Sequence, residues 1–197
     1  LLDARAWTLQ ERYLSRRQLR LLENKILWEC QEMIRDESER DPTEDYIKNH
    51  ITIPQLTGTS IWDREVNDQS YLMVSGYSIR HLTFKRDKFP AISGLVGIVA
   101  KHRGDRYCAG MWWTDIGHDI CWKVNRYKGS APRPKQYIAA SWSWTSVAGL
   151  VKFPATGANP SFKAPEPLHS VNYLDYGLQY RSQDIYGQLN GGWLRLQ

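Results

Sequence analysis

Residues 10–12 combine three side chains that could do chemistry on one turn of a predicted helix. Gln10 offers an amide, Glu11 a carboxylate and Arg12 a guanidinium. A carboxylate beside an amide can hold sugar hydroxyls, and one well-placed carboxylate can stabilise an oxocarbenium-like transition state. We therefore take Glu11 as a candidate catalytic residue and Gln10 and Arg12 as candidate binding residues. The structural alternative is a buried polar cluster, in which Glu11 pairs with Arg12, Arg16 or another arginine and fixes the helix against a sheet.

Histidines and cysteines between positions 102 and 121 have some features of a metal site. His118 and Cys121 are spaced like two zinc ligands, and His102 with Cys108 could supply a second pair. However, the sequence contains no C-x-x-C pair, and Cys108 lies in an apolar, aromatic run of the kind in which thiols usually pack in a core. We therefore predict no metal.

Serines and tryptophans alternate in the segment Ser141-Trp142-Ser143-Trp144. This alternation predicts a strand with the tryptophans on one face and the serines on the other. In one interpretation the tryptophans pack in the core; in the other, exposed indole faces stack against sugar rings. No G-x-S-x-G elbow and no cysteine-protease segment is present, so neither residue type is predicted as a nucleophile. Trp7, Trp142 and Trp144 are candidate binding residues.

The composition predicts a globular protein of one ordinary domain or two small ones. The chain has 197 residues, of which 42% are hydrophobic and 24% charged, and these values argue against intrinsic disorder. No apolar run approaches the length of a membrane span, and three scattered cysteines do not make a disulfide framework. We expect a cytoplasmic protein that does not bind a membrane.

The net charge of +5 is concentrated in one stretch. Residues 121–135 contain five cations and no acid, beside aromatic residues. Such a composition is found in grooves that bind single-stranded nucleic acid, and equally in solvated loops. We expect no nucleic-acid partner because no signature of a nucleic-acid-binding domain is present. The charge favours an acidic partner, such as a phosphate-bearing ligand.

The N-terminal half is predicted to be mostly helical around one hairpin. Residues 3–17 have a helical apolar period, and the runs 19–22 and 26–30 indicate a β-hairpin. Residues 31–70 are acidic and polar and predict a variable excursion, with a helix around 43–49. A second helix is predicted from an Asp87 N-cap, with Pro90 in its first turn, and its Gly94 and Gly97 allow close approach.

The C-terminal half is predicted to be rich in strands. Short runs of aromatic and β-branched residues, separated by Gly and Pro, indicate strands at 107–113, 120–124, 139–144, 150–153, 171–180 and 192–196. The predicted class is therefore α+β.

Four segments spread over residues 5–146 form a pattern when they are taken together. They are, in order, 5–12 with Leu14-Ser15 and Trp28-Glu29-Cys30; Tyr77-Ser78 with Arg80, Leu82-Thr83, Asp87-Lys88, Pro90-Ala91 and Ser93-Gly94; Tyr107, Ala109-Gly110, Trp112 and Trp122; and Ser141–Trp144 with Ser146. The first resembles the last conserved block of the heterokaryon-incompatibility (HET) domain of filamentous fungi, and the others resemble the segments that follow it. The end of the chain, with Tyr186-Gly187-Gln188 and Gly191-Gly192, fits the family more loosely.

The chain departs from the family in two respects. The two earlier blocks, a tyrosine-tryptophan-glycine opening and a tryptophan-aspartate block, are absent, and Ala140 stands where the family has a proline. The sequence also begins without an initiator Met or a signal segment, so we expect further residues upstream of Leu1. The resemblance thus implies the end of a HET core at residues 1–35, a variable insertion at 36–70 and an α+β module at 71–197.

The resemblance implies a role in nonself recognition that ends in programmed cell death. The HET core is thought to be similar to the TIR domain, a doubly wound fold that cleaves NAD in many relatives. NAD is then an expected substrate, no cofactor is firmly implied, and Glu11 would stabilise the charge that develops as nicotinamide leaves. Most of the active site would lie upstream, in the same protein or in a second chain, and the protein would self-associate. Two alternatives remain: a HET-like scaffold reused as a small-molecule or biosynthetic enzyme with a Trp-rich pocket, and a non-catalytic interaction module.

Overall fold

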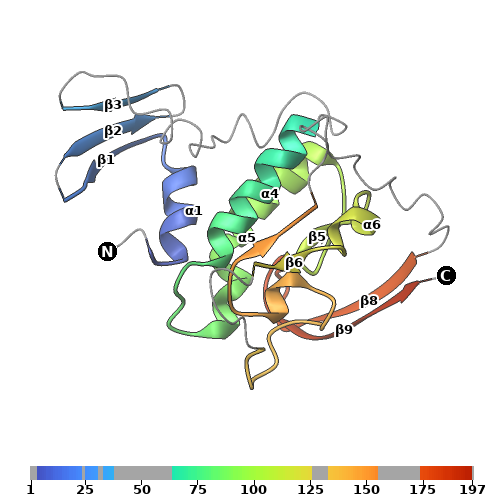
Figure 1. Ribbon diagram of the computed structural model, residues 1–197. Coiled ribbons are helices and arrows are strands. Elements are labelled where there is room, and N and C mark those ends of the chain that lie inside the picture. Colours follow the sequence, from blue (N-terminus) through green and yellow to red (C-terminus); the bar gives the residue numbers. More distant parts are fainter. Residues whose placement is uncertain are drawn as a thin grey trace.

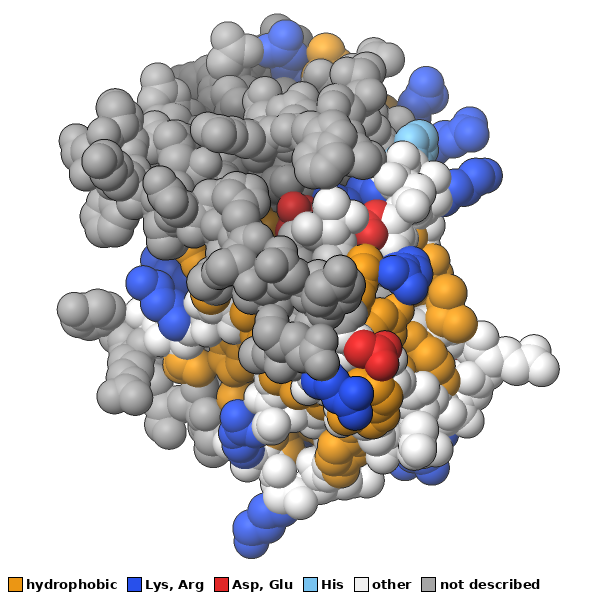
Figure 2. Space-filling model, turned by 90° about the vertical axis from the view of Figure 1, so that its right-hand side faces the viewer, with side chains coloured by type: hydrophobic (Ala, Val, Ile, Leu, Met, Phe, Trp, Pro, Cys, Tyr) orange, Lys and Arg blue, Asp and Glu red, His pale blue; other side chains and the backbone are white. Residues whose placement is uncertain are grey.

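The computed structural model describes residues 4–23, 25–30, 33–37, 64–125, 133–154 and 174–196. Helices and small antiparallel sheets alternate along the chain, which confirms the predicted α+β class. Figure 1 shows two long helices, α4 and α5, in the middle, an N-terminal sheet on one side and the β8–β9 hairpin on the other. On one face, Figure 2 shows apolar side chains interspersed with separate Lys and Arg side chains.

The N-terminal part consists of one helix and a three-stranded sheet. Its elements are α1 (Trp7–Leu14), β1 (Arg17–Leu21), β2 (Ile26–Cys30) and β3 (Ile34–Asp36). The predicted helix and hairpin are confirmed, although the helix is shorter than residues 3–17. Strand β3 was not predicted. It lies in the segment 31–70, which the sequence suggests is largely irregular, and it pairs with β2.

Helix α4 (Arg64–Ser78) was also missed by the sequence prediction. Ser70, Met73 and Tyr77 are buried along one side of it, at spacings of three and four residues that suit a helix. The segment 31–70 therefore ends in regular structure, because α4 begins at Arg64. The helix predicted around 43–49 lies outside the described residues.

Helix α5 (Pro90–Arg103) confirms the second predicted helix but corrects its start. Asp87 is not the N-cap: it lies in the short 3-10 helix η2 (Lys85–Lys88), and no side chain caps α5. Pro90 begins the helix, where its missing N–H removes no hydrogen bond. The helix ends at Gly104, whose φ of +62° is easiest for glycine. Gly94 allows close packing on α1, since a Cβ there would lie 3.0 Å from the amide of Gln10.

The remaining elements are short except for the last two strands, and most of them lie where strands were predicted. They are β4 (Tyr107–Cys108) paired with β5 (Met111–Trp112), α6 (Ile116–Asp119), β6 (Lys123–Val124) paired with β7 (Val151–Lys152), the 3-10 helix η4 (Trp144–Ser146), and β8 (Leu174–Tyr180) paired with β9 (Leu189–Leu196).

The strand predicted at 139–144 is wrong. Ser143 and Trp144 are both fully buried, whereas Ser141 is exposed and Trp142 is half-buried, so the residues do not alternate between two faces. The reason is local. The backbone turns into η4, where the Ser143 hydroxyl accepts a hydrogen bond from the N–H of Thr145. The fully buried Trp144 cannot serve as a platform for sugar rings.

Trp144 joins the turn between β4 and β5 to the rest of the core. Its Nε1 donates to the carbonyl of Gly110 at 2.6 Å, and the Ser143 hydroxyl donates to the carbonyl of Ala109 at 2.6 Å. The turn itself needs positive φ, which is 48° at Ala109 and 102° at Gly110. A Cβ on Gly110 would lie 2.6 Å from the indole nitrogen of Trp144, so this position admits only glycine.

We therefore expect Gly110→Ala to destabilise the fold by about 3 kcal/mol, through backbone strain and overpacking against Trp144. The matched control is Gly76→Ala in α4, where an added Cβ would meet no atom within 4 Å. That control should leave stability unchanged or raise it by up to about 1 kcal/mol. Denaturant unfolding measures both, and equal effects in the two variants would contradict the described turn.

Candidate functional site

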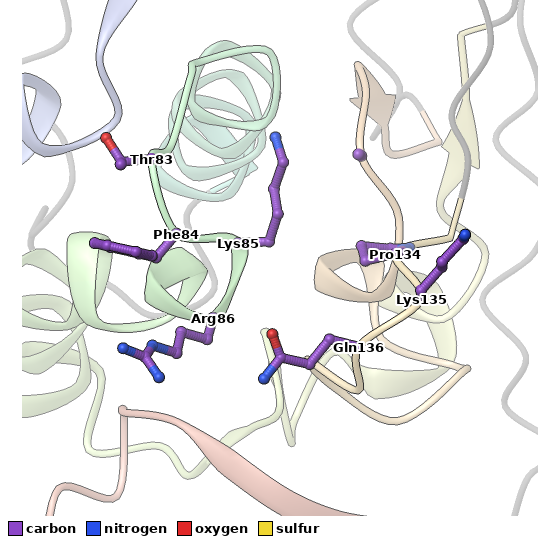
Figure 3. Close-up of a pocket in the computed structure, with 8 residues that line it drawn as sticks. Thr83, Phe84, Lys85, Arg86, Pro134, Lys135 and Gln136 are labelled. Carbon is purple, nitrogen blue, oxygen red and sulfur yellow. The ribbon is translucent and has the colours of Figure 1, made fainter.

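Two adjoining cavities form a cleft between the segment 78–88 and the segment 134–149. The outer cavity has a volume of about 560 Å³ and the inner one about 200 Å³, and Lys85, Pro134 and Ala148 line both of them. In Figure 3 the wall of residues 83–86 faces the wall of residues 134–136, and Gln136 reaches across toward the opposite side. The cleft is therefore built by segments about 50 positions apart in the sequence.

The lining of the cleft is cationic. Its charged or titratable members are Arg80, His81, Lys85, Arg86, Lys88 and Lys135, and no Asp or Glu is among the lining residues. Within the described ranges, no carboxylate forms an ion pair with Lys85 or Lys135. Cations of one sign in a concave site focus a positive potential, so the arrangement favours an anionic ligand.

Lys88 is the innermost cation of the cleft. Lys88 is only 6% exposed. Its Nζ donates to the carbonyl of Val147 at 2.5 Å and lies 5.1 Å from the ring centroid of Trp144. Burial, together with the nearby charge of Lys85, lowers the pKa of Lys88 to about 7. An amine with such a pKa in a cleft is typical of functional sites, since it is partly uncharged at neutral pH.

Sequence reasoning did not single out this cleft. A signal was present in the dense cations of 80–88, and Lys135 belongs to the basic stretch that drew attention to an acidic partner. The sequence could not show that these two segments face each other. That arrangement depends on the long-range contacts of Val147 and Trp144 with Lys88.

The structure does not bring Gln10, Glu11 and Arg12 together into one site. Gln10 accepts a hydrogen bond from the backbone N–H of Gly94 at 2.9 Å, so it fastens α1 to α5. Arg12 pairs with Glu29, with 2.8 Å between Nε and Oε1. Glu11 is exposed, and no described residue forms an ion pair with it, so the structural alternative proposed for Glu11 is wrong.

Glu29 is the buried carboxylate that the sequence analysis did not identify. It is 5% exposed and lies between Arg12 and Arg20, whose Nη1 is 3.4 Å from its Oε2. Exposed and buried residues alternate along β2, and this alternation places Glu29 on the same buried face as Leu27. The polar cluster that fixes α1 against the sheet therefore exists, with Glu29 in the place that was considered for Glu11.

The candidate tryptophans lie apart from the cleft or beneath it. Trp7 is 37% exposed on α1, and neither it nor Trp142 lines either cavity. The carbonyl of Trp142 accepts a hydrogen bond from Nε1 of Trp122 at 2.7 Å. Trp144 touches the site only through its ring, which lies under the amine of Lys88.

Two of the residues considered for zinc, Cys108 and His118, have other roles. Cys108 is fully buried, and burial raises the pKa of its thiol to about 12, as expected for a packing residue. His118 lies between Asp119 and the carbonyl of Pro154, at 3.4 and 3.1 Å, and the Tyr71 hydroxyl donates to Asp119 at 2.7 Å. Burial lowers the pKa of His118, but the hydrogen bond and charge of Asp119 outweigh burial and raise it. Among the described residues, no three His, Cys, Asp or Glu side chains form a group that could hold a metal.

Comparison with known proteins gave no match to a family model, to a curated protein or to a solved structure. Within the described residues, none of the helices has both the length and the apolar composition needed to cross a bilayer.

We expect Glu29→Gln to destabilise the fold by about 3 kcal/mol, because Arg12 and Arg20 would lose the charge of the buried carboxylate that they share. The matched control is Glu11→Gln on helix α1, and its effect should stay within about 0.5 kcal/mol because the side chain is exposed. Denaturant unfolding measures the stability of both variants. A larger loss for Glu11→Gln than for Glu29→Gln would contradict the described pairing.

Lys88 also predicts how stability depends on pH. In the unfolded chain a lysine keeps its proton up to its ordinary pKa of 10.5, whereas folded Lys88 releases it near pH 7. Between these values the unfolded state binds more protons, so stability rises with pH. From pH 7 to pH 9 this contributes about 2 kcal/mol.

The substitution Lys88→Met should remove that contribution. Between pH 7 and pH 9, the free energy of unfolding of the wild type should rise by about 2 kcal/mol relative to that of the variant. Denaturant unfolding at the two pH values measures it. A difference independent of pH would show that Lys88 is solvated.

Proposed function

We propose that this chain is part of a cytoplasmic HET-type protein that acts in nonself recognition and programmed cell death. The support is that residues of the four segments that resemble this family pack against one another in a single core. The contacts between them run from α1 to η4.

The first and second segments meet where α1 begins. The N–H of Ala6 donates to the carbonyl of His81 at 2.9 Å, and Arg5 forms a parallel bridge with His81. Further along, Gln10 accepts from the N–H of Gly94. The amide of the first segment and the glycine of the second therefore fit each other.

The second, third and fourth segments meet at Trp144. Tyr77 lies edge-on to the Trp144 ring, with 6.1 Å between the ring centroids, and its hydroxyl donates to the carbonyl of Lys88. Trp144 and Ser143 donate to the Ala109-Gly110 turn of the third segment. Trp144 therefore contacts the other two segments at once.

In this proposal the chain supports NAD cleavage that depends on upstream residues. The described residues of the four segments mostly pack the core, so the catalytic groups must come from elsewhere, in the same protein or in a second chain. Glu11 remains the candidate that this chain contributes, because it is exposed on α1 and can face an added domain.

The N-terminal sheet offers a surface for that added domain or for self-association. Leu19 faces Trp28 and Leu21 faces Ile26 across β1 and β2, and all four side chains are exposed. Exposed apolar patches of this kind mark interaction sites. The same face also suits the alternative function, a non-catalytic interaction module. No tryptophan lines either cavity of the cleft, so the cleft is not the Trp-rich pocket that the biosynthetic alternative requires.

The test is NAD turnover by three samples: the 197-residue chain, a longer protein that includes the upstream HET blocks, and that longer protein with Glu11→Ala. We expect turnover only with the upstream blocks present, and a loss of at least tenfold in Glu11→Ala at unchanged melting temperature. A melting temperature lowered along with activity would return Glu11 to a structural role. No turnover by any sample would leave the interaction module as the better proposal.

A further inference from the structure

We infer that the cleft between residues 78–88 and 134–149 binds a phosphate-bearing small molecule, with Lys85 and Lys135 meeting the phosphate from opposite walls. The inference goes beyond the proposed function and does not depend on it. It rests only on the charge, the volume and the lining of the cleft.

The charge of the lining calls for an anion. Lys85 and Lys135 lie on different walls, and their side chains are exposed. Within the ranges that the structure describes, neither has a carboxylate partner, so each keeps its charge available for a ligand. A phosphate carries more charge than a carboxylate, and lysine binds it as a point charge without a fixed geometry.

Lys88 adds a cation at the inner end of the cleft. It lines the inner cavity together with Lys85, and its amine is held by the carbonyl of Val147 above the Trp144 ring. A bound anion would favour the protonated form of this amine. The phosphate is therefore expected beside Lys85, which lines both cavities.

The volume and the apolar parts of the lining favour an organic ligand over a bare phosphate. A cavity of 560 Å³ lies within the roughly 300–1,000 Å³ range of small-molecule sites. Phe84, which is 57% exposed, lines the outer cavity from one wall, and Pro134 lines it from the other. These groups can cover an apolar or aromatic part of a ligand whose phosphate lies near Lys85.

A small molecule fits these observations better than a nucleic acid. Single strands bind along grooves in which several aromatic side chains stack successive bases. In the outer cavity Phe84 is the single aromatic lining residue, and the inner cavity has only the imidazole of His81. Arg86 lies over the Phe84 ring, with its guanidinium carbon 5.3 Å from the centroid, so Phe84 can offer its other face to a single ring but cannot stack successive bases.

Titration of the 197-residue chain with phenyl phosphate and with inorganic phosphate, followed by calorimetry or NMR shifts at pH 7 and low salt, tests the inference. We expect one saturable site, with phenyl phosphate binding at least threefold tighter than inorganic phosphate. The double variant Lys85→Met/Lys135→Met should weaken phenyl phosphate at least tenfold. Phe84→Ala should remove the preference for phenyl phosphate and leave the affinity for inorganic phosphate unchanged.

The matched control is Lys101→Met/Lys152→Met, which removes two exposed lysines that line neither cavity. Its affinity should stay within twofold of wild type, and circular dichroism confirms that both double variants are folded. Equal weakening in both double variants, or no saturable binding to the wild type, would overturn the inference. So would binding of single-stranded RNA or phosphatidylserine vesicles by a chain that ignores both phosphate probes.

Discussion

The burial of one indole ring organises this structure. Trp144 is fully enclosed, and its single polar atom is satisfied by the carbonyl of Gly110. A buried indole N–H without a partner would cost the desolvation of that group, so the turn at Ala109-Gly110 must keep its positive φ values to present this carbonyl. Tyr77 packs edge-on against the ring, and the amine of Lys88 lies over its face. Helix α4, the 3-10 helix η2, the β4–β5 turn and the loop that carries Trp144 are thereby fixed relative to one another.

The cationic cleft is a consequence of that arrangement. The loop that carries Trp144 also carries Val147, whose carbonyl holds the amine of Lys88, and it brings Lys135 opposite Lys85. The core therefore places a lysine of lowered pKa at the inner end of a site lined by cations from two distant segments. In the N-terminal part, Glu29 joins Arg12 of α1 to Arg20 of β1. The cleft is thus cationic, whereas the exposed face of the N-terminal sheet carries apolar side chains.

The elements with strong local patterns could be predicted from the sequence, and those that depend on tertiary contacts could not. The helix at α1, the hairpin β1–β2 and the Pro90 start of α5 follow from spacing and from proline geometry. The alternation of serine and tryptophan at 141–144 led to a wrong strand prediction, because the hydrogen bond of the Ser143 hydroxyl with Thr145 turns the backbone into η4. Asp87 looked like a cap but lies in η2. The sequence alone does not distinguish Glu11 from Glu29, and only the pairing of β1 with β2 makes Glu29 the buried one of the two.

The titration of the Lys88 amine tests the central claim most directly, because it reports the Trp144 core and the cleft together. The ¹³Cε resonances of lysine, followed by NMR from pH 5 to pH 11, give the pKa of each amine, and Lys88→Met assigns the one in question. The account predicts that this lysine titrates near pH 7, far below the ordinary value of 10.5. A value for Lys88 near 10.5 would place its amine in water. In that case neither the packing of Lys88 over Trp144 nor the cationic cleft would exist as described.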